Sequence, residues 1–497
     1  MMSGRPLCRS EVAAGLEPRA KYSLLFVALL LTVCSLPAFA YERQIPKQSD
    51  ALEGEARARF LMQNLRGFPE GATVERSWQE SENDRQFLLL IASDTWKYFD
   101  NIVDKERHLP LDQIHIAPDL MVGDYTSTTD IGLYIMCLVS GYDLGLIDRK
   151  EAVERIRATI TSAEGLEKYS GFLYNYYDTT TLERTSSFVS FVDSGWYLIG
   201  LVLARQAFSD ELWELCTDVL DSRDFSFFYD AEVRQMHHGY DTDENSYSQY
   251  HYGTFYTEAR AGSLLAIGKG DVPQEHWFGM YRVFPVEWDW QGQIPAVFKR
   301  RYLNLEVLEG YYKYDGTKIV PSWGGSMFEG LMSLMVIDEL RYAKRSLGTN
   351  ARRYVDAHID YCLNKLMYPV WGMSPCSVPG DGYGEFGVGL LGAKGYGDGV
   401  VTPHATFLAL VVHPKAAIKN LRRILAIYPG IYGEYGFYDS VDVRTSDVSR
   451  RYLFLDQAMS FISINNYLNR GAIQKRFHRD PIGRNVERLL KIERFYK

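Results

Sequence analysis

Two glutamates lie where a charged side chain is costly. Glu258 and Glu329 each fall within an apolar segment, residues 253–267 and 326–335. Burying a carboxylate costs several kcal/mol unless it is paired or protonated, and burial raises its pKa. A raised pKa suits a general acid. A salt bridge, for instance from Glu258 to Arg260, accounts equally well for a buried glutamate, and this alternative stays open at the level of sequence.

More carboxylates accompany Gly, Tyr and Trp just before apolar segments. Examples are GDYTSTTDIGLY from Gly123, YNYYDTTT from Tyr174 and PSWGGSMFEG from Pro321. Aromatic residues make up 14% of the chain, and a Tyr ring joins an apolar face to a hydroxyl, which suits the mixed surface of a sugar. Two carboxyl groups across an aromatic-lined cleft are what glycoside hydrolysis requires, because one protonates the leaving oxygen while the other attacks or activates water.

Other chemistries are less well supported. GYGEFG at 382–387 fits the dinucleotide pattern GxGxxG, but no strand precedes it and no βαβ unit surrounds it. The histidines His237, His238, His404 and His413 lack a metal-ligand spacing, so surface or hydrogen-bonding roles are expected for them. We therefore predict no cofactor and no metal. The formal net charge of −9 argues against nucleic-acid binding, which needs clustered Lys and Arg.

Hydrophobic patterning predicts the helices that position these residues. Apolar segments with few charges lie near 127–142, 188–206, 252–267, 326–338, 402–412 and 453–468. Amphipathic segments with one apolar face alternate with them, near 149–164, 209–222, 273–282, 348–366, 414–427 and 474–495. Alternation of fully buried and half-buried helices is what two concentric rings require. The sequence therefore predicts an all-α (α/α)6 toroid, a double ring of helices, as a single catalytic domain over residues 81–497.

The N-terminal region has the pattern of a secretory signal. Arg19 and Lys21 precede an apolar run over 24–33, and Ala38-Phe39-Ala40 supplies a small-residue cleavage pattern. The run is too short to span a bilayer, which takes about 20 apolar residues. We therefore expect a signal peptide over 1–40, a polar lead-in over 41–80, and a periplasmic or secreted protein without stable membrane insertion after signal removal.

From about residue 94 to 467 the chain resembles the glucoamylase-like superfamily of β-1,2-glucan-active enzymes. That superfamily includes bacterial endo-β-1,2-glucanases and the transglycosylase domain of cyclic β-1,2-glucan synthases. The resemblance rests on motifs in a fixed order: TSTTDIGLY at Thr126, GFLYNYYDTTTL at Gly171, SFVDSGW at Ser190, EARAGSLLAIGKGDVPQEHWF at Glu258, GGSMFEGLM at Gly324, WGMSP at Trp371, FGVGLLGAKG at Phe386, VVTPHATFLAL at Val400, NLRRI at Asn420, YGFYDSVD at Tyr435 and LDQAM at Leu455.

The resemblance implies roles for individual residues. Glu258 occupies the position of the general acid, which in this superfamily passes its proton through a sugar hydroxyl. Glu329 matches a Glu of the synthase motif that resembles the nucleophile or its equivalent. After Trp371-Gly372-Met373-Ser374 the relatives place a Glu, or a small residue leading to an Asp, whereas this chain has Pro375-Cys376. Asp381 is the nearest replacement for that second carboxylate, and Asp193 a further one.

These inferences predict a secreted or periplasmic glycoside hydrolase that cleaves linear or cyclic β-1,2-glucan, with Glu258 as acid and Glu329 or Asp381 as its partner. The residues expected to contact substrate are Tyr125, Asp130, Asp178, Asp193, Trp196, Trp323, Trp371, Tyr383 and Tyr435. A β-1,2-glucan transglycosylase or phosphorylase would use the same residues. A non-catalytic glucan-binding or assembly protein is the alternative from a different class.

Overall fold

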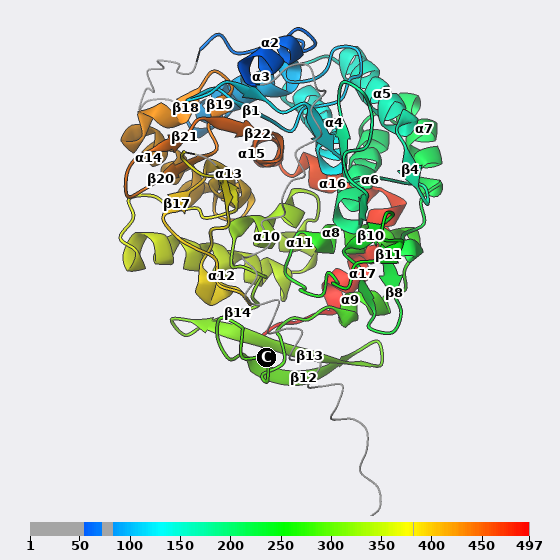
Figure 1. Cartoon of the computed structure of the whole chain (residues 1–497). Helices are drawn as coiled ribbons and strands as arrows, with labels where there is room; N and C mark the ends of the chain where they lie inside the picture. Colours follow the sequence, from blue (N-terminus) through cyan, green and yellow to red (C-terminus); the bar gives the residue numbers. More distant parts are fainter. Residues whose placement is uncertain (1–53, 72–82, 381, 497) are drawn as a thin grey trace, which may run out of the picture. The chain divides into compact units, whose positions relative to one another are not determined.

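Buried helices form the inner part of the molecule. The computed structural model describes residues 54–71, 83–380 and 382–496, all within one compact unit, Ile45–Lys497. Its inner helices are α4 (Thr128–Leu144), α6 (Phe191–Ala207), α8 (Ala259–Lys269), α10 (Met327–Leu331), α13 (Pro403–Leu408) and α15 (Phe454–Leu468). Each packs against the next, the 3-10 helix η2 (Met332–Met335) bridges α8 and α10, and α15 returns to α4. The six helices therefore close a ring (Figure 1).

A second set of helices covers the ring and is buried on one face only. These are α3 (Asp84–Asn101), α5 (Arg149–Gly165), α7 (Ser209–Asp221), α12 (Leu347–Asp360), α14 (Pro414–Ile427), α16 (Ala472–Arg479) and α17 (Pro481–Ile492). In Figure 1 the labels α3, α5, α7, α12 and α14 lie outside those of the inner helices. The two predicted rings are confirmed. Segments that are apolar on every face form the inner helices, and segments with a single apolar face form the outer helices.

One predicted outer helix is wrong in extent. Residues 273–282 form only the short helix α9 (Glu275–Gly279). The buried Arg282 explains this, because its Nη1 donates to the carbonyls of Trp277 and Met280, both at 2.8 Å, and a continuing helix would have used those carbonyls itself. The C-terminal α17 packs against α8 instead and takes the outer position there.

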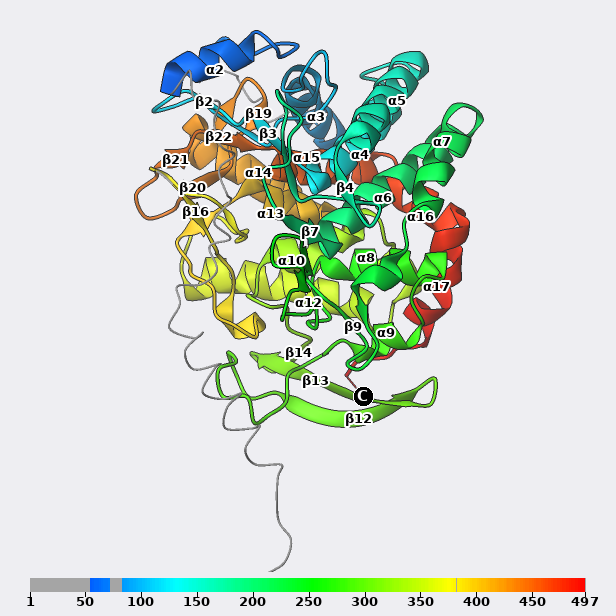
Figure 2. The same ribbon diagram turned by 45° about the vertical axis from the view of Figure 1, so that its right-hand side comes forward.

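A three-stranded antiparallel sheet was not predicted. Strands β12 (Ala296–Tyr302), β13 (Leu305–Tyr314) and β14 (Thr317–Ile319) pair in that order. Leu303 and Asn304 both have positive φ, 45° and 65°, which gives the two-residue turn that suits the twist of a hairpin. Both views place the sheet beside the C-terminal residues, where the main-chain N–H of Arg494 donates to the hydroxyl of Tyr302 (Figures 1 and 2).

Short strands lead directly into four inner helices. β3 (Tyr125–Ser127) precedes α4, β7 (Phe188–Ser190) precedes α6, β17 (Val400–Val401) precedes α13 and β22 (Arg451–Leu453) precedes α15. Their antiparallel partners are β6 (Tyr176–Asp178), β10 (Gly239–Asp241), β20 (Ser440–Asp442) and β1 (Gln113–His115). These pairs fix the main chain at the N-terminal ends of the inner helices.

The remaining elements are small. They are α2 (Gly54–Met62), α11 (Glu339–Tyr342), β2 (Met121–Val122), β4 (Lys168–Tyr169), β5 (Phe172–Leu173), β8 (Tyr229–Asp230), β9 (Gln235–Met236), β11 (Ser246–Tyr247), β15 (Cys376–Ser377), β16 (Tyr383–Gly384), β18 (Tyr432–Gly433), β19 (Gly436–Phe437) and β21 (Val448–Ser449).

The predicted N-terminal segments are described only in part. Helix α2 lies within the predicted lead-in, and its Arg57 forms a buried ion pair with Asp124 at 2.6 Å. The predicted signal peptide, 1–40, lies outside the described residues. Among the helices that are described, none combines the length and the apolar character that crossing a membrane would take.

Candidate active site

Carboxylates stand in the first turn of four inner helices. Asp130, Asp193, Glu329 and Asp456 are each the third residue of their helix, in α4, α6, α10 and α15. In the first three, a serine hydroxyl at the N-cap accepts a hydrogen bond from the main-chain N–H of the carboxylate residue. The helix dipole favours an anion at this end. The helical ring therefore gathers acidic groups at its N-terminal mouth.

Glu258 lies immediately before α8 and is partly exposed. Its main-chain carbonyl accepts a hydrogen bond from Ser333 Oγ at 3.2 Å. Within the described part of the chain, its carboxylate forms no ion pair and no hydrogen bond with another residue. Arg260, the expected partner of a structural salt bridge, instead pairs with Glu339 at 2.7 Å, both side chains being fully buried. The salt-bridge explanation for Glu258 is therefore wrong.

The carboxylate of Glu329 is held by several donors. Ser322 Oγ donates to Oε2 at 2.6 Å, and the main-chain N–H of Gly324 lies 3.1 and 3.0 Å from the two oxygens. The main-chain N–H of Ser326 donates to Oε2 at 3.4 Å, which completes a capping box. These contacts fix the orientation of the carboxylate relative to the start of α10.

The two glutamates differ in how their charge is stabilised. Burial raises the pKa of Glu258 to about 7, and the charge of Glu329 contributes to this rise as the second largest cause. Burial also raises the pKa of Glu329, but the hydroxyl of Ser322 and the main-chain N–H of Gly324 act in the opposite direction. Two carboxyl groups whose surroundings push their pKa values apart are typical of a general acid and its catalytic partner.

Tyr396 and Glu385 belong to this cluster and were missed at the level of sequence. Tyr396 is hydrogen-bonded to Glu329, and burial followed by the charges of Glu329, Glu385 and Glu258 raises the pKa of its hydroxyl. Burial and the charge of Glu329 raise the pKa of Glu385 as well. Both residues come from a glycine-rich loop without periodicity. A Cβ at Gly324 would lie 2.1 Å from the Tyr396 ring, so the close approach of ring and main chain requires glycine there.

Asp193 and Asp130 lie on neighbouring inner helices. Thr129 Oγ1 donates to Asp193 Oδ1 at 2.5 Å, which links the starts of α4 and α6. The charge of Asp193 also contributes to the raised pKa of Glu258, and burial raises the pKa of Asp193 itself. Asp130 accepts a hydrogen bond from the main-chain N–H of Ser127 at 3.1 Å. The structure therefore brings Asp193 into the field of Glu258, whereas Asp130 caps its own helix.

Several of the other predicted substrate contacts are buried. Trp196, Trp371 and Tyr435 have exposed fractions of 2%, 3% and 0%, so their rings present no free face. Trp196 lies inside the apolar helix α6, and Tyr435 accepts a hydrogen bond from Asn101. Asp178 accepts hydrogen bonds from the main-chain N–H groups of Thr180 and Thr181, both at 2.7 Å, and so closes a turn. These four side chains have structural contacts.

Trp323 and Tyr383 are exposed, whereas Tyr125 is buried. Tyr125 is 6% exposed, and its hydroxyl accepts a hydrogen bond from Gln113. Trp323 and Tyr383 are 37% and 54% exposed. Asp381, the alternative partner carboxylate, lies outside the described residues.

Trp323 is part of an aromatic surface that the sequence analysis did not identify. Its ring lies 5.8 Å from that of Trp290, which is stacked on Trp288 at 5.4 Å, and Phe284 packs beneath all three. Trp290 is 36% exposed. Trp323 directly precedes Gly324, whose main-chain N–H contacts the carboxylate of Glu329. We call Trp288, Trp290 and Trp323 the tryptophan surface.

The segment in which this chain departs from its relatives is buried. Cys376 is fully buried, and burial raises the pKa of its thiol, with the charges of Asp439 and Asp456 adding to the rise. Ser377 donates to Asp439 Oδ2 from both its N–H and its hydroxyl. His404, for which a surface or hydrogen-bonding role was expected, is buried and hydrogen-bonded to Thr402 Oγ1 at 2.7 Å; it lies beside Asp456, and burial lowers its pKa to about 3. Pro375-Cys376 therefore supplies no carboxylate, and burial keeps the Cys376 thiol protonated at neutral pH.

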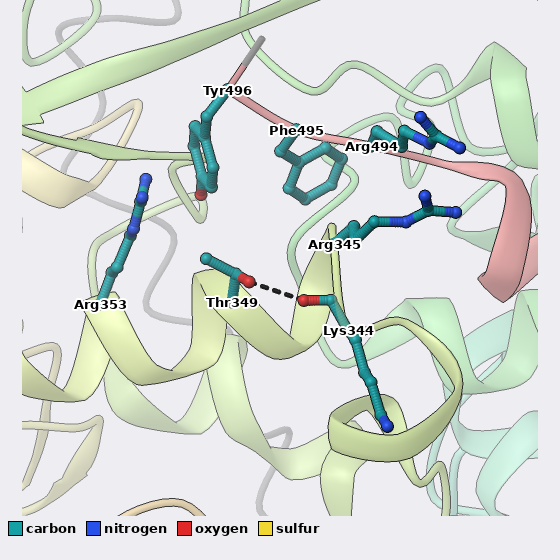
Figure 3. A pocket seen from close by; sticks show the side chains of 7 residues that line it. All are labelled: Lys344, Arg345, Thr349, Arg353, Arg494, Phe495 and Tyr496. Carbon is teal, nitrogen blue, oxygen red and sulfur yellow. Dashed lines mark hydrogen bonds between the residues drawn. The ribbon is translucent and has the colours of Figure 1, made fainter.

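Two surface cavities lie away from these carboxylates. One of about 330 Å³, near the C-terminus, is lined by Lys344, Arg345, Thr349, Arg353, Arg494, Phe495 and Tyr496 (Figure 3). The other, of about 570 Å³, is lined by Tyr314, Asp315, Gly316, Thr317, Lys318, Arg353, Asp356, Ala357 and Asp360. Neither contains a residue predicted to act on substrate.

Sequence comparisons relate the chain to proteins that carry β-1,2-glucan activities in their names. Residues 293–481 match the glycoamylase family, and residues 90–192 match DUF3131, a family of unknown function. The chain is 24% identical, over 85% of its length, to a cyclic β-(1,2)-glucan synthase of Rhizobium meliloti. It is 21% identical, over 77% of its length, to an exo β-1,2-glucooligosaccharide sophorohydrolase of Parabacteroides distasonis. It spans 19% and 55% of these two relatives.

Solved structures show the same fold. An endo-β-1,2-glucanase from Chitinophaga pinensis, in complex with sophorotriose and glucose, matches with a TM-score of 0.66 at 17% identity, over 82% of this chain and 98% of that one. A β-1,2-glucanase from Parabacteroides distasonis matches with a TM-score of 0.67 at 18% identity, over 84% of this chain and 61% of that one. The resemblance inferred from the ordered motifs is thus confirmed, and so is the double ring of helices.

Proposed function

We propose that this protein is a glycoside hydrolase that cleaves β-1,2-linked glucan. The observation that carries the proposal is the pairing of an unbonded carboxyl, Glu258, with a firmly held one, Glu329. Glu258 has a pKa of about 7 and forms no ion pair with any residue that the structure describes, so part of the population is protonated at neutral pH. Glu329 contributes to that pKa through its charge and is oriented by fixed donors. This is the acid and partner arrangement of glycosidases.

The reaction follows from these positions. Glu258 gives its proton to the glycosidic oxygen, directly or through an intervening sugar hydroxyl as the resemblance implies, as the bond from that oxygen to the anomeric carbon breaks. Glu329 either takes a proton from the water that attacks the anomeric carbon or attacks that carbon itself before water releases the sugar. Tyr396 donates to Glu329 and favours its ionised form. Glu258 is thus the acid and Glu329 its partner.

The choice of substrate rests on the relatives. Both curated relatives are named for β-1,2-linked glucans or oligosaccharides, and so are the two solved structures described above. The tryptophan surface beside Glu329 offers flat apolar area for sugar rings. We propose linear or cyclic β-1,2-glucan as the substrate. The basic and apolar run before Ala38-Phe39-Ala40 supports a periplasmic or secreted location.

A transglycosylase is the second candidate, favoured by the similarity to a cyclic glucan synthase over 85% of the chain. In that case a sugar hydroxyl replaces water as the acceptor. The same carboxylates would serve, because only the acceptor differs.

The test is an assay of reducing ends released from a panel of β-1,2-, β-1,3- and β-1,4-glucans. We expect release from β-1,2-glucan alone, and a loss of about 100-fold or more in Glu258→Gln, since general acid catalysis contributes about 10²- to 10⁴-fold. Glu167→Gln, a half-exposed glutamate whose carboxylate pairs with Arg184, is the matched control. Unchanged turnover in Glu258→Gln would refute the acid assignment.

Product analysis separates the alternatives. Longer or cyclic glucans without new reducing ends would identify a transglycosylase, and glucosyl phosphate formed only with added phosphate would identify a phosphorylase. Tight binding of β-1,2-glucan without bond cleavage at any pH would identify a non-catalytic binding protein and overturn the hydrolase proposal.

A further inference from the structure

Three possible metal ligands meet between α7 and α8. Asp230 ends strand β8, His237 directly follows strand β9, and His251 lies opposite His237 in an isolated antiparallel bridge. His251 Nε2 lies 3.0 Å from Asp230 Oδ2, and His237 Nε2 lies 3.8 Å from the same oxygen. One donor atom from each residue lies within 4.8 Å of the others. The hairpin thus brings together three residues that show no spacing pattern in the sequence.

The orientation of His237 is fixed by its second nitrogen. Its Nδ1 lies 3.0 Å from the main-chain carbonyl oxygen of Ser248, a group that can only accept, so Nδ1 carries the proton. Nε2 therefore presents a lone pair toward Asp230. The ring of Tyr247 stacks on His237 with centroids 4.6 Å apart and limits its rotation. A backbone carbonyl that orients the imidazole in this way is the usual outer partner of a metal-binding histidine.

The separations suit a small divalent ion. Ligands at about 2.0 to 2.2 Å from a tetrahedral Zn²⁺ lie about 3.3 to 3.6 Å from one another. The two nitrogen–oxygen separations in the structure, 3.0 and 3.8 Å, lie on either side of this range. The side chains of Asp230, His237 and His251 are 23%, 18% and 21% exposed, so the cluster is sheltered but reachable by ions and by a completing water.

We infer that Asp230, His237 and His251 bind a divalent transition-metal ion, for which Zn²⁺ is the probe. Two imidazole nitrogens and one carboxylate oxygen form the donor set, which suits Zn²⁺ and excludes a site built for Ca²⁺ or Mg²⁺. The bound ion would join the β8–β9 hairpin to the segment that leads from His251 to Glu258. This changes the expectation from sequence that His237 has only a surface or hydrogen-bonding role.

The experiment measures metal binding directly and does not depend on glucan cleavage. The full chain, stripped with a chelator and then dialysed, is titrated with Zn²⁺ by calorimetry. Co²⁺ is titrated in parallel and followed by its visible absorption spectrum. We expect one saturable site per chain and a Co²⁺ spectrum typical of nitrogen and oxygen ligands. Zn²⁺ should also raise the thermal unfolding temperature, since a ligand that binds the folded state stabilises it.

Variants assign the site. His251→Ala and Asp230→Asn should each weaken Zn²⁺ binding by at least about 10- to 100-fold, the loss seen when only an outer partner of a metal ligand is removed. His413→Ala is the matched control, because His413 also faces a carboxylate, Asp356 at 3.1 Å, but is not joined there by a second histidine from the described ranges. Circular dichroism checks that each variant is folded. Absence of saturable binding to the wild-type chain, or equal binding by His251→Ala and His413→Ala, would overturn the inference.

Discussion

Arg260 donates a hydrogen bond from Nη1 to the main-chain carbonyl of Glu329 at 3.2 Å. The same nitrogen donates to the carbonyl of Thr257 at 2.7 Å, so one guanidinium fixes the main chain beside both proposed catalytic glutamates. Its charge is balanced by Glu339. The cation nearest to Glu258 in sequence is therefore used for positioning, and among the described residues the carboxyl of Glu258 forms no ion pair.

Replacing Arg260 should cost much of the stability of the fold. In Arg260→Met the buried Glu339 loses its partner, and we expect a loss of about 3 to 5 kcal/mol in the free energy of unfolding. Urea denaturation measures this loss. Arg59→Ala, which breaks an exposed ion pair with Glu55, should cost less than about 1 kcal/mol. A loss for Arg260→Met no larger than that of the control would contradict the positioning role.

The pKa of Glu258 predicts how stability depends on pH. Its folded-state pKa, about 7, lies above the usual value of 4.5, so the folded protein binds this proton more tightly than the unfolded chain. The resulting stability is fully present below the unfolded pKa and is lost as pH rises through about 7. Glu258→Gln lacks this titration. The melting temperature of Glu258→Gln relative to that of the wild type should therefore increase as the pH is raised from about 5 to about 8. If the melting temperatures of the two proteins changed with pH in parallel over this interval, a raised pKa of Glu258 would be ruled out.

Tyr396 should influence catalysis through Glu329. Its hydroxyl lowers the pKa of that carboxyl, so Tyr396→Phe should raise it and move the acidic limb of the kcat/KM profile to higher pH. A hydrogen bond to a charged group contributes about 1.5 to 3 kcal/mol, so kcat/KM should fall by about 10-fold or more. Tyr368→Phe removes a hydroxyl that contacts Asp398 and Arg444 and serves as control. An unshifted acidic limb in Tyr396→Phe would contradict the assignment.

The tryptophan surface should govern binding more than chemistry. Trp290→Ala and Trp323→Ala should each raise KM for long glucans by about 5- to 30-fold, equivalent to one or two kcal/mol, with little change in kcat. Steady-state kinetics on chains of increasing length measure this effect. Trp213→Ala provides the control, because Trp213 is 39% exposed on the outer helix α7 and packs on Arg205. A fall in kcat at constant KM would contradict a binding role.

The sequence predicted the helices well for a physical reason. The segments 188–206 and 453–468 are apolar on every face, and they became α6 and α15 with bounds within three residues of the prediction. The sheet of β12, β13 and β14 was missed although its second hairpin turns at Asp315-Gly316, a pair typical of such turns; its first hairpin turns at Leu303-Asn304, which lacks the usual Gly. The extent of α9 depended on Arg282, a tertiary contact that local periodicity does not reveal.

The site was predicted only in part, because burial of an aromatic ring cannot be read from its type. Trp196 and Trp323 both follow the expected composition, yet one lies inside a helix bundle and the other at the surface. Tyr396 and Glu385 come from a loop without periodicity and were not identified. For the carboxylates, the sequence holds a stronger signal than aromatic composition. This signal is a Ser followed three residues later by an acidic residue, and it recurs at Ser127, Ser190 and Ser326. That pattern marks the starts of inner helices and their carboxylates together.

The capped starts of the inner helices have a consequence for how activity can change within this architecture. An acidic residue is stabilised at several equivalent positions around the N-terminal mouth of the ring, because the helix dipole and the main-chain N–H groups there favour a carboxylate whether or not it takes part in a reaction. The proposed proton donor is instead Glu258, at the start of α8, which has no such cap and whose carboxyl receives no hydrogen bond from another described residue. Loss of a cap can thus transfer that role from one helix to another while the helical framework stays the same.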